Sequence, residues 1–164
     1  MDDILMAPQQ LENEKRSRLA AEASLRVVSE RLEKAEEAAG ALIYDWDIAS
    51  QQVWRSSGLT RILGWQTDEV APTVEGWVAL QHPADRERLK TLQDPDFFQE
   101  NDNYVMEYRL KHKAGFYVWV LDSGRVFREA SGAIIRQTGV IIDISARKKV
   151  AESLSRQTNL IELS

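Results

Sequence analysis

Cysteine is absent from the 164 residues, and its absence removes whole classes of chemistry. The chain can form no disulfide, no thiolate metal site and no cysteine nucleophile. It also cannot support a photochemistry that joins a flavin to a cysteine sulfur. With only two histidines, His82 and His112, a zinc site made from protein ligands alone is not expected either.

Long apolar runs and an excess of positive charge are also missing. No stretch approaches the roughly 20 apolar residues of a membrane-spanning helix, and the first residues, MDDILMAPQQ, lack the features of a signal peptide. The net charge of −5 disfavours nucleic acid as a partner, because phosphate contacts need a basic surface. Hydrophobic residues make up 43% of the chain, enough for a globular core. We therefore expect a cytoplasmic module without membrane contact.

Glycine and proline are absent from residues 9–39, a segment rich in Ala, Glu, Leu, Arg and Lys, which favour helix. From Ala21 onward the apolar residues follow a heptad pattern. Its two core positions are occupied by Leu25, Val28, Leu32 and Ala35. A helix this polar is not expected inside a core. Residues 1–39 are therefore predicted to form an amphipathic, coiled-coil helix that needs a partner strand, and Gly40 to end it.

Residues 40–145 carry the signals of one globular domain. Two strands joined by a turn are expected at 42–47 and 51–55. Short helices are expected next. One lies in SGLTRILG, a second starts near Thr67, which we take as its N-cap, and two more are separated at His82-Pro83. Pro83 is expected to open the later helix, because proline is favoured in the first turn.

A change to period two begins at Tyr104, where apolar and polar residues alternate as far as Lys111. Two longer strands are expected at 116–129 and 134–144. The short turns between them contain Gly115 and Gly132. Three strands linked by two short turns predict an antiparallel meander, and the order of strands, helices and strands predicts an α+β fold.

The last strand runs into a final helix without a loop, in the stretch VIIDISARKKVAESL. Residues 146–164 show the apolar stripe of a helix, which we interpret as a linker leading to a following domain. Ser145 is expected to cap this helix through its hydroxyl. Asp143 adds negative charge near the helix N-terminus and is expected to reach Arg147 or another cation of the domain, while Ile144 packs inward. A joint without a flexible loop would pass movement of the sheet to the helix.

Catalytic and metal-binding motifs are hard to find. The sequence has no nucleophile elbow and no phosphate-cradling glycine loop, so we expect no catalytic residue and no enzyme activity in this chain. The acidic stretch 94–102 lacks the central glycine and closing glutamate of an EF-hand and is interpreted as a solvated loop, which leaves no metal site. His82 is the one candidate axial ligand for a haem, but its position before Pro83 favours a structural role.

Four stretches, in this order, resemble the PAS domain family in its bacterial sensor form. They are LTRILGWQTDEV, HPADRERL, EYRLKHKAGFYVWV and GVIIDISARKKVAE. Ala84 and Ala114 stand where the family usually has Asp, and Ser145 stands where it usually has Thr. The resemblance covers about 41–149. It implies a five-stranded antiparallel sheet of order 2-1-5-4-3 with short helices on one face.

The resemblance also implies a hollow between the sheet and the short helices, the kind of concave apolar site that small molecules prefer. The candidate wall residues are Ile62, Trp77, Leu89, Met106, Tyr108 and Val140. Their aromatic rings could stack on a flavin or another flat ligand. The alternative, which we favour on sequence alone, is that these large side chains fill the core and that no cofactor is bound.

The two flanking helices carry the functional interpretation. The resemblance implies a sensor or dimerisation module, within a sensor histidine kinase of a two-component system or within a cyclic-dinucleotide enzyme. We expect a homodimer formed through the flanking helices and an adjacent PAS, kinase or other output domain. The signal would pass through Asp143, Ile144, Ser145 and Arg147. The alternative is a sensor of a diguanylate cyclase or phosphodiesterase that binds a ligand or cofactor, namely a flavin, a haem or a small aromatic molecule.

Overall fold

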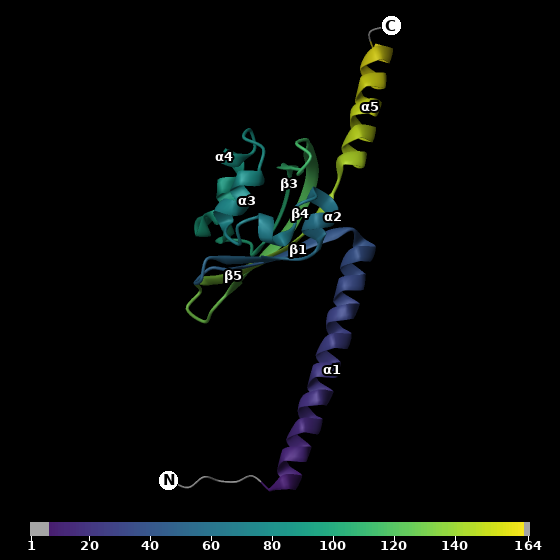
Figure 1. The fold of residues 1–164 in the computed structure, drawn as a ribbon. Coiled ribbons are helices and arrows are strands. Elements are labelled where there is room, and N and C mark those ends of the chain that lie inside the picture. Colours follow the sequence, from purple (N-terminus) through teal and green to yellow (C-terminus); the bar gives the residue numbers. More distant parts are fainter. Residues whose placement is uncertain (1–6, 163–164) are drawn as a thin grey trace. The chain divides into compact units, whose positions relative to one another are not determined.

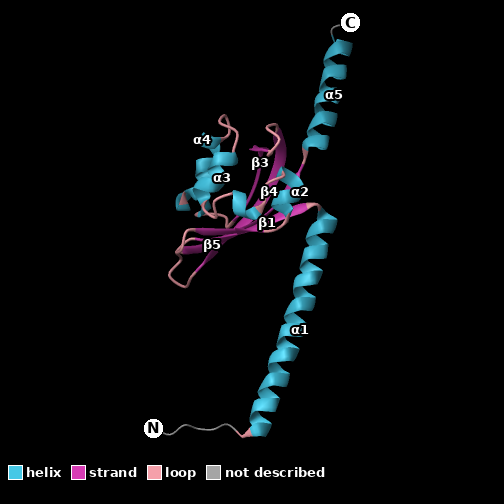
Figure 2. Ribbon diagram, in the orientation of Figure 1, coloured by secondary structure: helices cyan, strands magenta, loops and turns pink. Residues whose placement is uncertain are grey.

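The computed structural model describes residues 7–162, with side chains as far as residue 158. The chain divides into two compact units, the first ending at Ala38 and the second beginning at Ala39. Helix α1 (Pro8–Ala39) makes up the first unit, and the second holds five strands and the remaining helices (Figure 2). No helix within residues 7–162 is both long and apolar enough to cross a membrane.

Helix α1 follows the composition of its sequence, which contains no helix-breaking residue after Pro8. Proline is tolerated in the first turn, where its missing N–H has no intrahelical partner. Gly40, with a φ of 60°, adopts the left-handed conformation that ends helices, as predicted. Leu25, Val28 and Leu32 are each more than half exposed on the surface of α1. The pairing of this apolar stripe with a second helix remains a prediction.

The second unit is built on one antiparallel sheet of order β2-β1-β5-β4-β3, which confirms the predicted topology (Figure 1). Its strands are β1 (Ala41–Asp47), β2 (Gln52–Arg55), β3 (Asn103–Lys111), β4 (Tyr117–Arg128) and β5 (Ile134–Asp143). The central strand β5 pairs with β1 on one side and β4 on the other. Because side chains alternate between the two faces of a strand, each strand contributes to both surfaces of the sheet.

Short helices lie over one face of this sheet, which we call the inner face (Figure 1). They are α2 (Gly58–Leu63), η1 (Thr67–Glu69), α3 (Val74–Leu80), α4 (Arg86–Leu89), η2 (Lys90–Gln93) and η3 (Pro95–Phe98). Two predicted starts are wrong. Gln66 rather than Thr67 caps η1, because Glu69 reaches back to the Gln66 N–H at 2.8 Å. Pro83 lies in a turn, and α4 begins three residues later.

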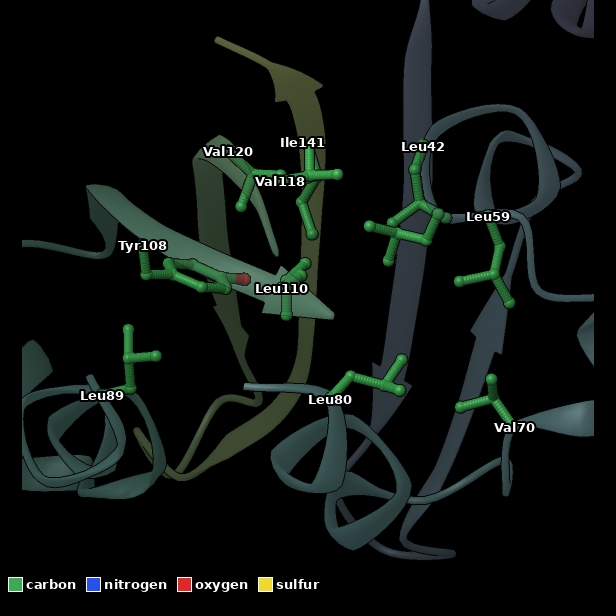
Figure 3. Packing of buried hydrophobic residues seen from close by; sticks show 11 residues of the cluster. Leu42, Leu59, Val70, Leu80, Leu89, Tyr108, Leu110, Val118, Val120 and Ile141 are labelled. Carbon is green, nitrogen blue, oxygen red and sulfur yellow. The ribbon is translucent and has the colours of Figure 1, made fainter. Parts of the chain in front are cut away.

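The core fills the space between the inner face and the helices (Figure 3). Leu42, Tyr108, Leu110, Val120 and Ile141 project from four neighbouring strands and are almost completely buried. The helices supply Leu59, Leu80 and Leu89 from the other side. Each fully buried side chain of this size contributes about 1.5–3 kcal/mol to folding. The alternation of these residues with exposed ones fixes which strand face meets the helices.

One ion pair fastens the start of α4 to β3. The Asp85 carboxylate accepts hydrogen bonds from the Arg109 backbone N–H at 3.0 Å, from Nε at 3.0 Å and from a terminal guanidinium nitrogen at 2.9 Å. Arg109 holds the pKa of Asp85 below its usual range, chiefly by these hydrogen bonds. Asp85 is buried, so its charge requires this bidentate partner.

We expect Asp85→Ala to lower the free energy of unfolding by about 2–4 kcal/mol, because it removes three hydrogen bonds and leaves a partly buried guanidinium without its anion. Urea denaturation monitored by tryptophan fluorescence measures the change. Asp68→Ala, at an exposed position of η1, is the matched control and should change stability by less than about 0.5 kcal/mol. Equal effects of the two substitutions would show that the Asp85–Arg109 pair does not fasten α4.

Candidate functional site

A small cavity of about 70 Å³ lies between the inner face of the sheet and helices α3, α4 and η2. Most of its wall is apolar or aromatic, as in sites that bind small molecules. The wall is formed by Tyr44, Trp46, Val53, Arg55, Val74, Trp77, Val78, Gln81, Leu89, Leu92, Gln93, Tyr108, Asp122 and Gln137. The polar members belong to two groups with different hydrogen-bonding states.

The first group depends on a pair of glycines at the centre of the sheet. Gly124 of β4 and Gly139 of β5 lie opposite each other. Tyr104 lies beside Gly124 and Tyr44 beside Gly139, so the two tyrosines flank the pair across four strands. A Cβ atom at Gly124 would lie 2.3 Å from the Tyr104 hydroxyl, and one at Gly139 would lie 2.4 Å from that of Tyr44. The glycines therefore let both rings lie across the sheet until their hydroxyls meet.

Asp122 is the acceptor at the centre of this tyrosine cluster, as we call Tyr44, Tyr104, Tyr108 and Asp122. Its carboxylate accepts a hydrogen bond from the Tyr108 hydroxyl at 2.8 Å and one from Tyr44 at 3.1 Å. The Tyr104 hydroxyl is hydrogen-bonded to that of Tyr44 and accepts a hydrogen bond from the Gln137 side-chain amide at 2.9 Å. Burial raises the pKa of Asp122 to about 7, while the tyrosine hydrogen bonds favour its charged form. The polar groups of the cluster are therefore hydrogen-bonded to one another and to Gln137 and Trp77.

The second group consists of Arg55 and Trp46, which lie on the neighbouring strands β2 and β1. Arg55 is buried and donates to the carbonyls of Ala71 at 2.9 Å and Thr73 at 2.8 Å. Its guanidinium also lies over the Trp77 ring, 5.2 Å from the centroid. The indole N–H of Trp46 is buried and has no hydrogen-bond acceptor within the described part of the chain. This part of the wall therefore offers donors that the protein does not use fully.

A wider groove of about 470 Å³ shares part of the same wall. The shared residues are Trp46, Val74, Leu92, Gln93 and Gln137, and the groove continues along Pro95, Phe98 and Ile134. Trp46 therefore stands at the boundary between the cavity and the groove. A ligand in the groove could place one end inside the cavity.

The structure brings three of the six predicted wall residues to the cavity, namely Trp77, Leu89 and Tyr108. Ile62 and Met106 are partly buried and pack against the core without lining the cavity. The assignment of Val140 to the wall is wrong. Val140 is 41% exposed, because it lies between Gly139 and Ile141 on the strand and points to the opposite face.

The prediction missed the residues that give the cavity its polarity, above all Asp122, Arg55, Tyr44 and Trp46. Period two in β1 carried a usable signal, because Tyr44 and Trp46 share the face of Leu42. The alternation in β4 carried the same signal for Asp122, which shares the buried face of Val118, Val120 and Val126.

A second candidate site is the joint where β5 passes into helix α5 (Ser145–Glu162). Ile144 is buried, as predicted, and its N–H donates to the Trp119 carbonyl of β4 at 2.8 Å. The Trp119 N–H donates in return to the Ser145 hydroxyl oxygen at 3.1 Å. The predicted cap is therefore wrong in its partner, because the Ser145 oxygen accepts from the sheet rather than from the helix. Asp143 accepts from the Ser145 N–H at 2.8 Å.

Glu107 of β3 ties the first turn of α5 to the sheet. Its carboxylate pairs with both Arg147 and Lys148, and these cations, Lys148 above all, lower the pKa of Glu107. The Lys148 ammonium also lies 4.5 Å from the Trp119 ring centroid. The expected contact of Arg147 with Asp143 is replaced by its ion pair with Glu107, because Arg147 turns toward β3.

Neither a haem nor a flavin fits the cavity. His82 and His112 do not line it. His82 packs against Tyr117, with ring centroids 4.5 Å apart, and accepts a hydrogen bond from the Ala84 N–H. A cavity of about 150 Å³ holds a single benzene ring, so about 70 Å³ is too small for a tricyclic flavin. Within the part of the chain that is described, no three His, Asp or Glu side chains gather where they could hold a metal ion.

Comparison with known proteins supports the resemblance seen in the sequence. Residues 52–141 match the family model described as PAS fold. A sensory box histidine kinase/response regulator from Burkholderia thailandensis has a similar fold, with a TM-score of 0.67, 24% identity and coverage of 82% of this chain and 99% of that one. The N-terminal domain of a diguanylate cyclase with a PAS/PAC sensor from Marinobacter aquaeolei gives a TM-score of 0.59 at 25% identity, covering 66% and 98%.

Among curated sequences, the uncharacterized protein y4lL of Sinorhizobium fredii is 31% identical over 81 residues. The match covers 48% of this chain and spans only 9% of that protein's length. It therefore concerns one domain of a much longer protein.

The tyrosine cluster predicts an unusual dependence of stability on pH. The pKa of Asp122 is about 7 in the folded protein and about 3.9 in an unfolded chain. The folded state therefore binds the Asp122 proton more tightly than the unfolded chain does, which stabilises the fold. This stabilisation is fully present below about pH 4 and is lost as pH rises through 7. We expect it to amount to a few kcal/mol in wild type and to vanish in Asp122→Asn, when urea denaturation of both proteins is compared at about pH 5 and 8.

Carbon-detected NMR titration of the side-chain carboxyls checks the cause of this effect. The exposed Asp47 serves as the internal control, since a hydrogen bond from the Ser50 N–H lowers its pKa. If Asp122 titrates near the pKa of an ordinary aspartate, burial does not raise its pKa and the prediction is wrong.

Proposed function

The chain belongs to the PAS fold family, and we propose that it is a dimeric signal-transduction module that relays a change in its sheet to a following output domain. The observation that carries this proposal is the joint between β5 and α5. Hydrogen bonds run in both directions between Trp119 and the residues Ile144 and Ser145. A connection fixed in this way transmits a displacement that a flexible loop would absorb.

The two faces of the sheet supply the input and output of this relay. On β3, Glu107 holds α5 on one face, while its neighbour Tyr108 enters the cavity on the other. On β4, Trp119 contacts the joint, while Val120 next to it lies in the core. A shift of these strands caused by a change in the cavity would move the partners of Arg147 and Lys148. This coupling is local and needs no long chain of intermediates.

The exposed apolar stripe of α1 supports a dimer. Leu25, Val28 and Leu32 are exposed by 68%, 60% and 55%, and Ala35 completes the heptad. An isolated helix gains little from leucines in water, whereas a parallel partner would bury them. A dimer joined through the flanking helices would bring two α5 helices into one output assembly.

We assign the parent protein to the sensor histidine kinases of two-component systems as the first choice, with the chain acting in the cytoplasm. A ligand-binding sensor of a diguanylate cyclase or phosphodiesterase is the second candidate. The cavity favours this second candidate, since the indole N–H of Trp46 lacks an acceptor among the residues that the structure describes. The similar folds in a histidine kinase and in a diguanylate cyclase are consistent with either parent.

The double variant Leu25→Asp with Leu32→Asp should be monomeric in sedimentation velocity, because charge at two heptad core positions cannot be buried in a coiled coil. Wild type should sediment as a dimer. Arg26→Asp with Glu30→Lys changes an exposed charge pair of α1 at positions outside the heptad core, and is the matched control that should remain dimeric. A dimer that persists in the Leu25/Leu32 variant would exclude the coiled-coil interface.

Asp143→Ala should alter the output activity of the parent protein several-fold, because it removes the carboxylate that holds the first N–H of α5. Loss of such a cap costs about 1 kcal/mol, so the domain itself should stay folded. Asp47→Ala is the control, since Asp47 accepts a similar bond from the Ser50 N–H in the β1–β2 turn. Kinase or cyclase assays of both variants make the comparison, and unchanged output in Asp143→Ala would count against the relay through the joint.

A further inference from the structure

We propose that the cavity binds a small monocarboxylic acid, with its carboxylate on Arg55 and Trp46 and its apolar body in the adjoining groove. The inference rests on the ligand-binding candidate function and names the chemical class of the ligand. It is independent of the relay through α5.

Arg55 is a buried cation without a matching anion. Its residue is only 7% exposed. Among the side chains of residues 7–158, no carboxylate pairs with Arg55, and its guanidinium donates to the neutral carbonyls of Ala71 and Thr73. These bonds use two of the five N–H groups of a guanidinium. Burial lowers the pKa of Arg55 to about 10, so the group is still charged at neutral pH and favours a bound anion.

Trp46 adds a second unused donor on the same side of the cavity. Its buried indole N–H has no acceptor among residues 7–158, a state that destabilises the protein until an acceptor is supplied. Trp46 pairs with Val53 across the β1–β2 ladder, and Arg55 lies two residues further along β2 on the same face. The backbones of such diagonal neighbours lie roughly 7–8 Å apart, which is within reach of long side chains, so both donors can contact one ligand.

The carboxylate oxygens of Asp122 in the cavity wall already accept hydrogen bonds from the protein. The Asp122 oxygens receive the hydroxyls of Tyr108 and Tyr44, so the wall offers spare donors rather than spare acceptors. A bound water would satisfy Trp46 but would leave the charge of Arg55 uncompensated. Asp122 shares the cavity and carries part of a negative charge near neutral pH, which disfavours a ligand with two charges.

The volumes limit the shape of the ligand. The cavity of about 70 Å³ accepts a carboxylate and a few carbon atoms but not an aromatic ring. The groove of about 470 Å³ accepts the remainder, against the apolar side chains of Val74, Leu92 and Ile134. A short aliphatic or arylalkyl monocarboxylate meets both limits.

Isothermal titration with hexanoate and phenylacetate, each matched with its neutral amide, tests the inference at about pH 6, where Asp122 is mostly protonated. We expect at least one acid to bind wild type about tenfold more tightly than its amide, because only the acid compensates Arg55. Arg55→Gln should abolish this preference. Equal binding of acid and amide, or no binding of either acid, would overturn the inference.

Trp46→Phe keeps the ring and removes only the unused N–H, so it tests the site even if Arg55→Gln fails to fold. We expect it to weaken the acid about five- to tenfold, with an unchanged circular dichroism spectrum. Trp54→Phe, on an exposed tryptophan of β2, is the control and should leave binding unchanged. Unaltered acid binding in Trp46→Phe would remove the indole from the site and overturn the proposed geometry.

The same titrations separate this inference from the relay. A Leu25/Leu32 variant that stays dimeric, with wild type still preferring the acid, would speak against the coiled-coil dimer alone. A dimeric wild type that shows no preference for the acid would speak against the carboxylate site alone.

Discussion

The alternation of side chains between the two faces of the sheet is the constraint on which the rest of the structure depends. It places Tyr108 in the cavity and its neighbour Glu107 against the first turn of α5. On β4, the same alternation points the side chains of Asp122 and Leu121 to opposite faces of the sheet. A one-residue slip of β3 or β4 would exchange these roles and expose the core, so the packing of the hydrophobic residues also fixes the functional geometry.

The tyrosine cluster shows how a charge can be kept inside that packing. The facing glycines Gly124 and Gly139 leave room for two rings across the middle of the sheet, and the hydroxyls of Tyr44 and Tyr108 converge on Asp122. The carboxyl is thereby satisfied without an ion pair. Arg55, in the wall of the same cavity, has no such arrangement with an anion among the described residues, and this asymmetry is why the cavity favours a ligand that carries negative charge.

The fold was predictable because its signals are local. Period two in β3 and the glycines of the turns defined the meander, and four motif-like stretches in order supplied the sheet topology. The polar contacts were not predictable in the same way. Ser145 looks like a helix cap in sequence, yet its oxygen accepts from Trp119, 26 residues earlier. Glu107 binds Arg147 across 40 residues, and such pairings depend on register rather than on local pattern.

The central claim is that α5 leaves the sheet through a rigid joint. Amide hydrogen exchange at Ile144 and Lys148 tests it most directly, since these N–H groups bond to the Trp119 and Ile144 carbonyls. The account predicts that both exchange as slowly as Leu121 in the β4–β5 ladder and far more slowly than Thr158 later in α5. Exchange of Ile144 and Lys148 at the rate of Thr158 would contradict it, because the joint would then open independently of the sheet.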